Sequence, residues 1–113
     1  YKFALRVVKM VRALPKDIAG QTMGRQALRA ATSVGANVEE AIGYTTKREF
    51  IQKMSIAFRE ARETHYWLRL IRDAGMVSPK RIAALIQEAL EIKKILAKTV
   101  STAKKRAATR KSV

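Results

Sequence analysis

The residues of this chain that are best suited to chemistry are basic residues spaced to contact phosphate groups. Five of them lie within residues 1–16, where no acidic residue occurs: Lys2, Arg6, Lys9, Arg12 and Lys16. Successive members are 4, 3, 3 and 4 residues apart, which places them on one face of a helix. Lysine and arginine bind phosphate oxygens without reading base sequence. We interpret this N-terminal basic stripe as a polyanion-binding surface of low sequence specificity, with a solvated helix face as the alternative.

A second acid-free segment lies at the other end of the chain. Residues 92–113 contain eight basic residues: Lys93, Lys94, Lys98, Lys104, Lys105, Arg106, Arg110 and Lys111. The formal net charge of the 113 residues is +15, from 24 basic and 9 acidic residues. Like charges repel, so a small domain without a charged partner does well with a net charge of about 2–8. The excess, held mainly at the two ends, indicates a polyanionic partner such as RNA or DNA.

Other arginines lie closer to acidic residues. Arg25 and Arg29 share a face of the second predicted helix and complete the predicted nucleic-acid-binding set. Four more lie farther along the third predicted helix: Arg59, Arg62, Arg69 and Arg72. We expect several of these six to pair with Glu60, Glu63 or Asp73 in a structural role. Arg62 and Arg69 are one heptad apart and could instead extend the basic surface.

Residue types that perform catalysis or bind metal ions are scarce. There are no cysteines, which excludes disulfides, cysteine-ligated zinc and thiol nucleophiles. The one histidine, His65, follows Glu60 by five positions and Glu63 by two, whereas bundle di-metal sites require Glu-x-x-His. No glycine-rich phosphate loop or nucleophile motif is present. We therefore expect neither a metal or other cofactor nor an enzymatic activity.

Helical periodicity predicts the elements that position these residues. Glycine and proline are few and lie between the periodic segments. Four helices are predicted, at residues 2–14, 21–42, 47–74 and 79–103. Apolar residues alternating 3 and 4 apart on the last two helices are typical of a bundle seam. The predicted fold class is all-α, an up-down antiparallel four-helix bundle over residues 1–103, with residues 104–113 fraying into a basic tail.

The bundle has consequences for the charged ends. The first helix starts at the end where the fourth helix finishes, so we expect the two acid-free segments to converge.

Small residues on the second helix, including Gly24 and Gly35, predict close approach of another helix. A second apolar stripe, including Phe58, Trp67 and Ile95, indicates either a homo-oligomeric interface or a wide core face.

One motif resembles a known family. It is Ser33-Val34-x-x-Asn37-Val38-x-Glu40, followed by Phe50 and by Glu60-x-x-Glu63. Over residues 3–96 the chain resembles the bacterial four-helix-bundle family of 23S ribosomal RNA intervening-sequence proteins. That family includes the accessory variability determinant proteins of diversity-generating retroelements. Members often have Gly where this chain has Ala41. We interpret Ser33, Asn37 and Glu40 as a structural motif, either a buried hydrogen-bond site or a lock between helices.

The resemblance implies a ring-like homopentamer of bundles. In the retroelement branch, it implies a non-catalytic accessory protein that binds RNA or cDNA and a reverse transcriptase during mutagenic retrohoming. The charge of +15 favours that branch. The alternative is a scaffold of undefined role, as in the ribosomal branch, that acts through protein–protein contacts.

The expected location is the bacterial cytoplasm. No secretory signal is visible, and the longest uncharged stretch is residues 30–38, whereas a membrane span needs about 20 apolar residues. Attachment of the amphipathic first helix to anionic lipid is a further alternative. Its apolar face, however, is needed by the bundle, so we expect no membrane partner.

Overall fold

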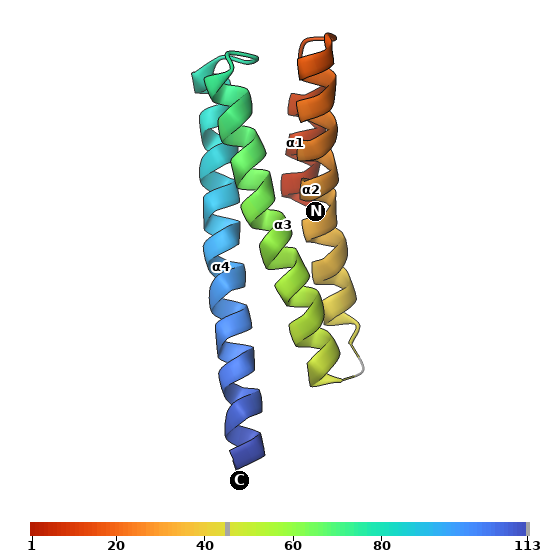
Figure 1. Ribbon diagram of the computed structural model, residues 1–113, viewed down its shortest axis with the longest axis vertical. Coiled ribbons are helices and arrows are strands. Elements are labelled where there is room, and N and C mark those ends of the chain that lie inside the picture. The colour runs from red at the N-terminus through yellow and green to blue at the C-terminus, as the bar shows by residue number, and fades with distance from the viewer. Residues whose placement is uncertain (45, 113) are drawn as a thin grey trace.

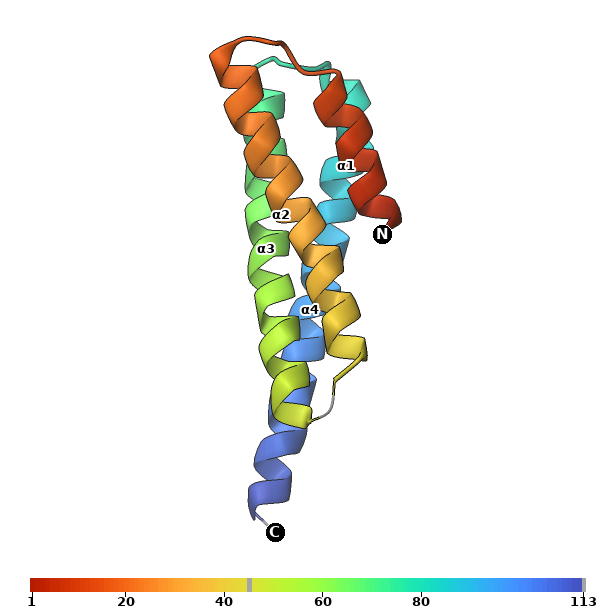
Figure 2. The ribbon, with the colours of Figure 1, turned by 90° about the vertical axis from the view of Figure 1, so that its right-hand side faces the viewer.

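Four helices joined by short turns make up the fold. The computed structural model describes residues 1–44 and 46–112, with side chains through Thr109. The helices are α1 (Lys2–Arg12), α2 (Ile18–Ile42), α3 (Lys47–Asp73) and α4 (Pro79–Ser112). Successive helices run in opposite directions (Figures 1 and 2), and the described residues contain no strand. The predicted all-α four-helix bundle is therefore confirmed.

Capping residues set the helix boundaries. Asp17 caps α2 by accepting a hydrogen bond from the Gly20 N–H at 2.8 Å, so α2 begins three residues earlier than predicted. A Cβ on Gly20 would lie 2.0 Å from the Pro15 carbonyl oxygen, so this turn requires glycine. Thr46 caps α3 by accepting from the Glu49 N–H at 3.1 Å, the bond made by the first residue of a Thr-x-x-Glu capping box. Gly75, with a φ of +72°, follows the end of α3.

The predicted seam of α3 forms the centre of the core. All six residues of its periodic run from Met54 are buried: Met54, Ala57, Ala61, Thr64, Leu68 and Ile71. Full burial of a leucine or isoleucine side chain contributes about 1.5–3 kcal/mol. The second apolar stripe belongs mostly to this core, because Phe58 and Trp67 pack against it, whereas Ile95 stays 62% exposed.

The lengths of the helices differ greatly. α1 has 11 residues and α4 has 34, so their lengths are about 17 and 51 Å at 1.5 Å per residue. The N-terminus consequently lies beside the middle of the bundle (Figure 2). The core cluster around Val7 includes α1, whereas the cluster around Val34 is built from α2, α3 and α4. One half of the bundle thus has four helices and the other half has three.

The structure differs from the sequence prediction at both charged ends. Residues 104–112 continue α4 as helix instead of fraying, consistent with their content of alanine, lysine and arginine. Residue 113 lies outside the described residues. The acid-free segments do not converge. The short helix α1 lies beside the first half of α4, whereas the far end of α4 projects past the other helices (Figure 1). The periodicity of a helix shows which residues share a face, but it does not show where α1 lies along the length of α4.

Candidate nucleic-acid interface

The N-terminal basic stripe lies along the exposed face of α1 and its following turn. Lys2, Arg6, Lys9 and Arg12 are exposed on the helix, and Lys16 is exposed after it. Arg6 is paired with Glu88 of α4: its Nε lies 3.0 Å from Glu88 Oε2, and its second amino group contacts the other carboxylate oxygen. Although residues 1–16 contain no acidic residue, the fold places Glu88 of α4 beside the N-terminal basic stripe.

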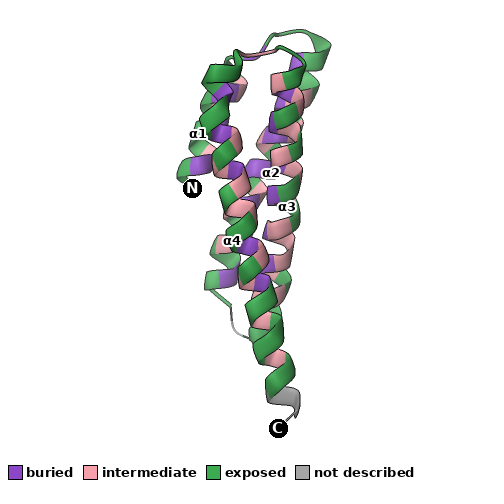
Figure 3. Ribbon diagram, turned by 90° about the vertical axis from the view of Figure 1, so that its left-hand side faces the viewer, coloured by how far each residue is buried: buried purple, intermediate pink, exposed green. Residues whose placement is uncertain are grey.

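The C-terminal basic residues divide into two groups. The projecting end of α4 is exposed (Figure 3), and Lys104, Lys105 and Arg106 are exposed there. Lys98 is also exposed but lies between the core residues Leu96 and Val100, within the bundle. The side chains of Arg110 and Lys111 lie outside the described residues. Lys94 is exposed and Lys93 half-buried farther back along α4, where α3 lies alongside. The predicted set is therefore distributed over the length of the molecule.

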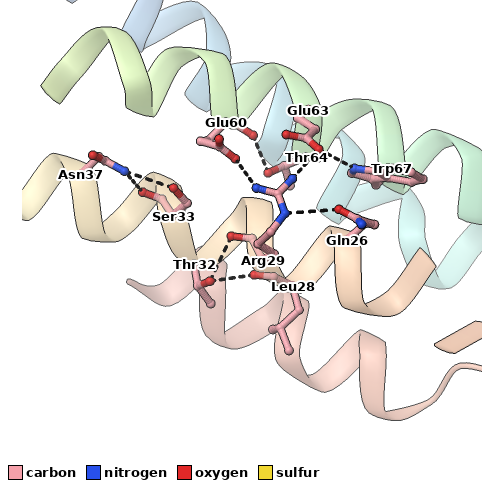
Figure 4. A network of polar contacts seen from close by, with 10 residues as sticks. All are labelled: Gln26, Leu28, Arg29, Thr32, Ser33, Asn37, Glu60, Glu63, Thr64 and Trp67. Atoms are coloured by element: carbon pink, nitrogen blue, oxygen red, sulfur yellow. Dashed lines mark hydrogen bonds and ion pairs between the residues drawn. The ribbon is translucent and has the colours of Figure 1, made fainter. Parts of the chain in front are cut away.

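Arg29 belongs to a structural cluster. Its Nη1 lies 3.2 Å from Glu60 Oε2, and its Nη2 donates to Glu63 Oε1 (Figure 4). Trp67 Nε1 donates to the same Glu63 oxygen at 3.1 Å. The hydrogen bonds from Arg29 and then Trp67 hold the pKa of Glu63 below its usual value. The structural pairing predicted for Arg29 is confirmed. Arg29 was also predicted to bind nucleic acid, but its guanidinium is engaged by Glu60 and Glu63.

The family motif on α2 forms mainly local contacts. Asn37 Nδ2 donates to the Ser33 carbonyl oxygen at 2.9 Å and to Ser33 Oγ at 3.1 Å, all within α2 (Figure 4). Asn37 is half-buried and this bond does not lock two helices together. Glu40 provides the link between helices instead, because Lys53 Nζ of α3 lies 2.8 Å from Glu40 Oε2.

Gly24 and Gly35 of α2 have different surroundings. A Cβ on Gly24 would lie 3.0 Å from Leu14 Cδ1 and 3.1 Å from Val11 Cγ1, so α1 and its turn pack closely there, as predicted. A Cβ on Gly35 would meet no atom within 4 Å, so the expected close approach is absent at Gly35. Gly35 instead lines an apolar hollow of about 460 Å³ with Tyr1, Val34 and Ile92. The hollow lies where α1 begins.

A further basic surface lies between α3 and α4. Arg59, Arg62 and Arg69 of α3 line an open hollow of about 420 Å³ together with Tyr66 and with Lys93 of α4. The sequence predicted only Arg62 and Arg69 as a possible extension of the basic surface. Helical spacing could have predicted this group. The three arginines and Tyr66 are 3, 4 and 3 positions apart, so they share one face of α3, as the residues of the N-terminal basic stripe share one face of α1.

The described residues contain neither a metal-binding cluster nor a membrane-spanning helix. No group of three or more histidine, aspartate or glutamate side chains among them is arranged to hold a metal ion. No helix in this part of the chain is long and apolar enough to cross a membrane. His65 is half-buried beside the hollow; burial, and then the charges of Lys93, Arg69 and Arg72, lower its pKa from 6.5.

The bundle and its motif agree with comparisons to known proteins. Residues 1–98 match the family model described as 23S rRNA-intervening sequence protein. The chain belongs to this family. A crystal structure from Bacteroides thetaiotaomicron, of a protein of unknown function from the S23 ribosomal protein family, is 33% identical in sequence. The match covers 88% of this chain and 92% of that one, with a TM-score of 0.80. No curated protein matches the chain.

The 23S rRNA-intervening sequence family match covers α1, α2, α3 and the beginning of α4. It ends at residue 98, before the projecting end of α4 that carries Lys104, Lys105 and Arg106. The match thus includes the N-terminal basic stripe and the hollow between α3 and α4. The resemblance predicted from the α2 motif is confirmed at the level of this family.

Proposed function

We propose that the protein is a non-catalytic accessory protein that binds RNA or DNA through its phosphate groups. The observation that carries the proposal is the large number of cations on exposed helix faces. The described ion pairs engage Arg6, Arg29, Lys53 and Arg72, which leaves most of the chain's 24 basic residues for a partner. Such contacts release counterions from the nucleic acid and give binding without sequence specificity.

A titration across salt concentrations tests this proposal. The protein is added to fluorescent RNA and DNA oligonucleotides, and anisotropy gives the affinity at each salt concentration. We expect log K to fall linearly with log salt, with a slope of about 0.7 per contacted phosphate on single strands and about 0.9 on duplex DNA. Absence of binding at low salt, or an affinity that salt leaves unchanged, contradicts the proposal.

We further propose that the protein acts in the retroelement branch of its family, with a reverse transcriptase as its partner. Its charge and the resemblance described above support this branch. The gene's neighbourhood provides the test. A reverse transcriptase gene and a near-repeat pair beside it are expected, whereas an rRNA operon around it would place the protein in the ribosomal branch.

A homopentameric ring is part of the same proposal. Exposed apolar side chains support an interface between copies: Ile42 is 71% exposed and Ile95 62% exposed. Light scattering should then give a particle of about five times the 12.7 kDa chain mass. A particle of 12.7 kDa rejects the ring. Repetition of a weak phosphate contact around the ring would raise the affinity for a long polyanion.

A scaffold acting through protein–protein contacts is the second candidate. The apolar hollow beside Gly35 favours it, because an exposed apolar recess is a common place for another protein to bind. Replacing all five residues of the N-terminal basic stripe with glutamine distinguishes the two functions. The scaffold predicts unchanged activity for this variant, and nucleic-acid binding predicts a loss.

A further inference from the structure

The hollow between α3 and α4 combines cations with an aromatic ring, and we call it the α3–α4 groove. Its α3 side carries Arg59, Arg62, Tyr66 and Arg69, and its α4 side carries Lys93. Arg59 and Arg69 are ten residues apart, so the groove extends about 15 Å along α3 at 1.5 Å per residue. This length can hold more than one nucleotide.

The positive charge of this groove is not neutralised by its one acidic residue. Glu63 is the carboxylate that lines the hollow, and it is held by Arg29 of α2 and by Trp67. Arg59, Arg62 and Lys93 make no ion pair within the described part of the chain. The lowered pKa of His65 reflects in part the positive field there, since Lys93 and Arg69 contribute to it.

The side chains of the groove are partly held in position before any ligand binds. Arg62 lies over the Phe58 ring, with its guanidinium carbon 5.8 Å from the ring centroid. Arg69 Nε donates to the His65 carbonyl oxygen at 3.3 Å. Neither contact removes the positive charge. Side chains that are already ordered lose less entropy on binding.

Tyr66 presents an aromatic surface among these cations. It is 49% exposed, and its ring packs edge-to-face on Trp67 with centroids 5.0 Å apart and an interplanar angle of 77°. Trp67 is fixed in turn by its bond to Glu63. A tyrosine supported from one side and open on the other resembles the stacking platforms that bind unpaired bases.

We infer that the α3–α4 groove binds single-stranded RNA or DNA, with an unpaired base stacked on Tyr66 and phosphates on Arg59, Arg69 and Lys93. The inference rests on the proposed function and assigns a strand type and a surface to it. In a duplex the faces of internal bases are covered by their neighbours. A duplex could therefore use the cations of the groove but could not use Tyr66.

The stacking test compares a single-stranded 20-mer with a duplex of the same sequence by fluorescence anisotropy. Tyr66→Ala should weaken single-strand binding by about 5-fold or more, the range found for loss of one base stack, and leave duplex binding nearly unchanged. Tyr66→Phe, which keeps the ring, should bind like wild type. Tyr44→Ala is the matched control, because Tyr44 is 47% exposed on another part of the bundle.

The phosphate test uses variants matched in charge. Arg59→Gln combined with Arg69→Gln removes two cations from the groove. Lys80→Gln combined with Arg81→Gln removes two exposed cations from the start of α4. The first pair should lower the single-strand salt slope by about 1.4, at about 0.7 per lost contact, and the second pair should leave it unchanged. Circular dichroism confirms that each variant is folded.

The outcomes separate this inference from the proposed function. If the wild type binds neither strand type at low salt, both are overturned. If it binds but the groove variants match their controls, or if Tyr66→Ala weakens duplex binding equally, the groove is overturned and the proposed function stands. If polyglutamate of equal charge displaces the probe as well as an unlabelled oligonucleotide does, the surface is a general polyanion site and the inference also fails.

Discussion

Among single residues, Glu63 connects the ion pair between α2 and α3 to the aromatic side chains of α3. It accepts from Arg29 of α2 and from Trp67 of its own helix. These bonds connect α2 to the lone tryptophan, which in turn supports the ring of Tyr66. A change at Glu63 should therefore affect stability and the groove together.

Two substitutions at Glu63 should lower the free energy of unfolding by different amounts. The side chains of Arg29 and Glu63 are 48% and 36% exposed, so solvent screens the pair, and Glu63→Gln should lower the free energy of unfolding by less than about 1 kcal/mol. Glu63→Leu also removes the acceptor of Trp67 and should cost about 1 kcal/mol more. Urea unfolding followed by tryptophan fluorescence measures both. Glu39→Gln is the control, and equal midpoints for all three variants would contradict the prediction.

His65 should make stability depend on pH in a window below 6.5. Its folded-state pKa is lowered by burial and by neighbouring cations, so the folded state resists protonation. Stability is therefore fully retained above pH 6.5 and declines as pH falls from there towards the lower folded pKa. His65→Gln should flatten urea midpoints measured between about pH 5 and pH 8. A slope that persists in this variant would assign the effect to another group.

Among the elements, α2 should respond in opposite ways to alanine at two of its glycines, Gly20 and Gly35. Gly35→Ala should raise the free energy of unfolding by up to about 1 kcal/mol, because alanine favours the helix and its Cβ would meet no atom within 4 Å. Gly20→Ala should destabilise the protein, because its Cβ would lie 2.0 Å from a backbone oxygen. Thermal unfolding of the two variants measures the contrast. Equal shifts in the same direction would contradict it.

The sequence predicted elements and burial better than relations between distant residues. The ends of α3 were predicted well because Thr46 and Gly75 act locally, and its seam was predicted because buried residues follow the helical repeat. Arg6 and Glu88 are 82 positions apart, and their pairing depends on how far α1 reaches along α4. The α3–α4 groove likewise depends on Lys93 facing α3. Helical spacing groups residues on one helix but does not place two helices relative to each other.

The whole molecule is a rod of 56 × 21 × 21 Å, and one of its ends is formed by α4 (Figure 3). This end holds a row of cations and few buried residues: Val100 is the last buried residue of the core clusters. Among the described side chains, none from residues 104–109 belongs to the core clusters. Their effect is expected on binding.

Removal of residues 104–113 should separate binding from folding. The variant loses five cations and no residue of the described core clusters, so its thermal midpoint should change by only a few degrees. Its salt slope on single strands should fall by up to about 3.5, at about 0.7 per lost phosphate contact. Replacing Lys104, Lys105 and Arg106 with glutamine is the control that keeps the helix. An unchanged slope in both variants would show that this end does not touch nucleic acid.

Because α1 is much shorter than α4, the rate of amide hydrogen exchange should vary along α4. Early in α4, Ile82 and Leu85 are buried in a cluster that includes α1, whereas exposed residues predominate after Val100. Amide hydrogens should therefore exchange slowly near Leu85 and progressively faster towards Ser112 within one continuous helix. A ligand that binds the fast-exchanging end would slow exchange there first, so hydrogen–deuterium exchange could locate its contact before any complex is crystallised.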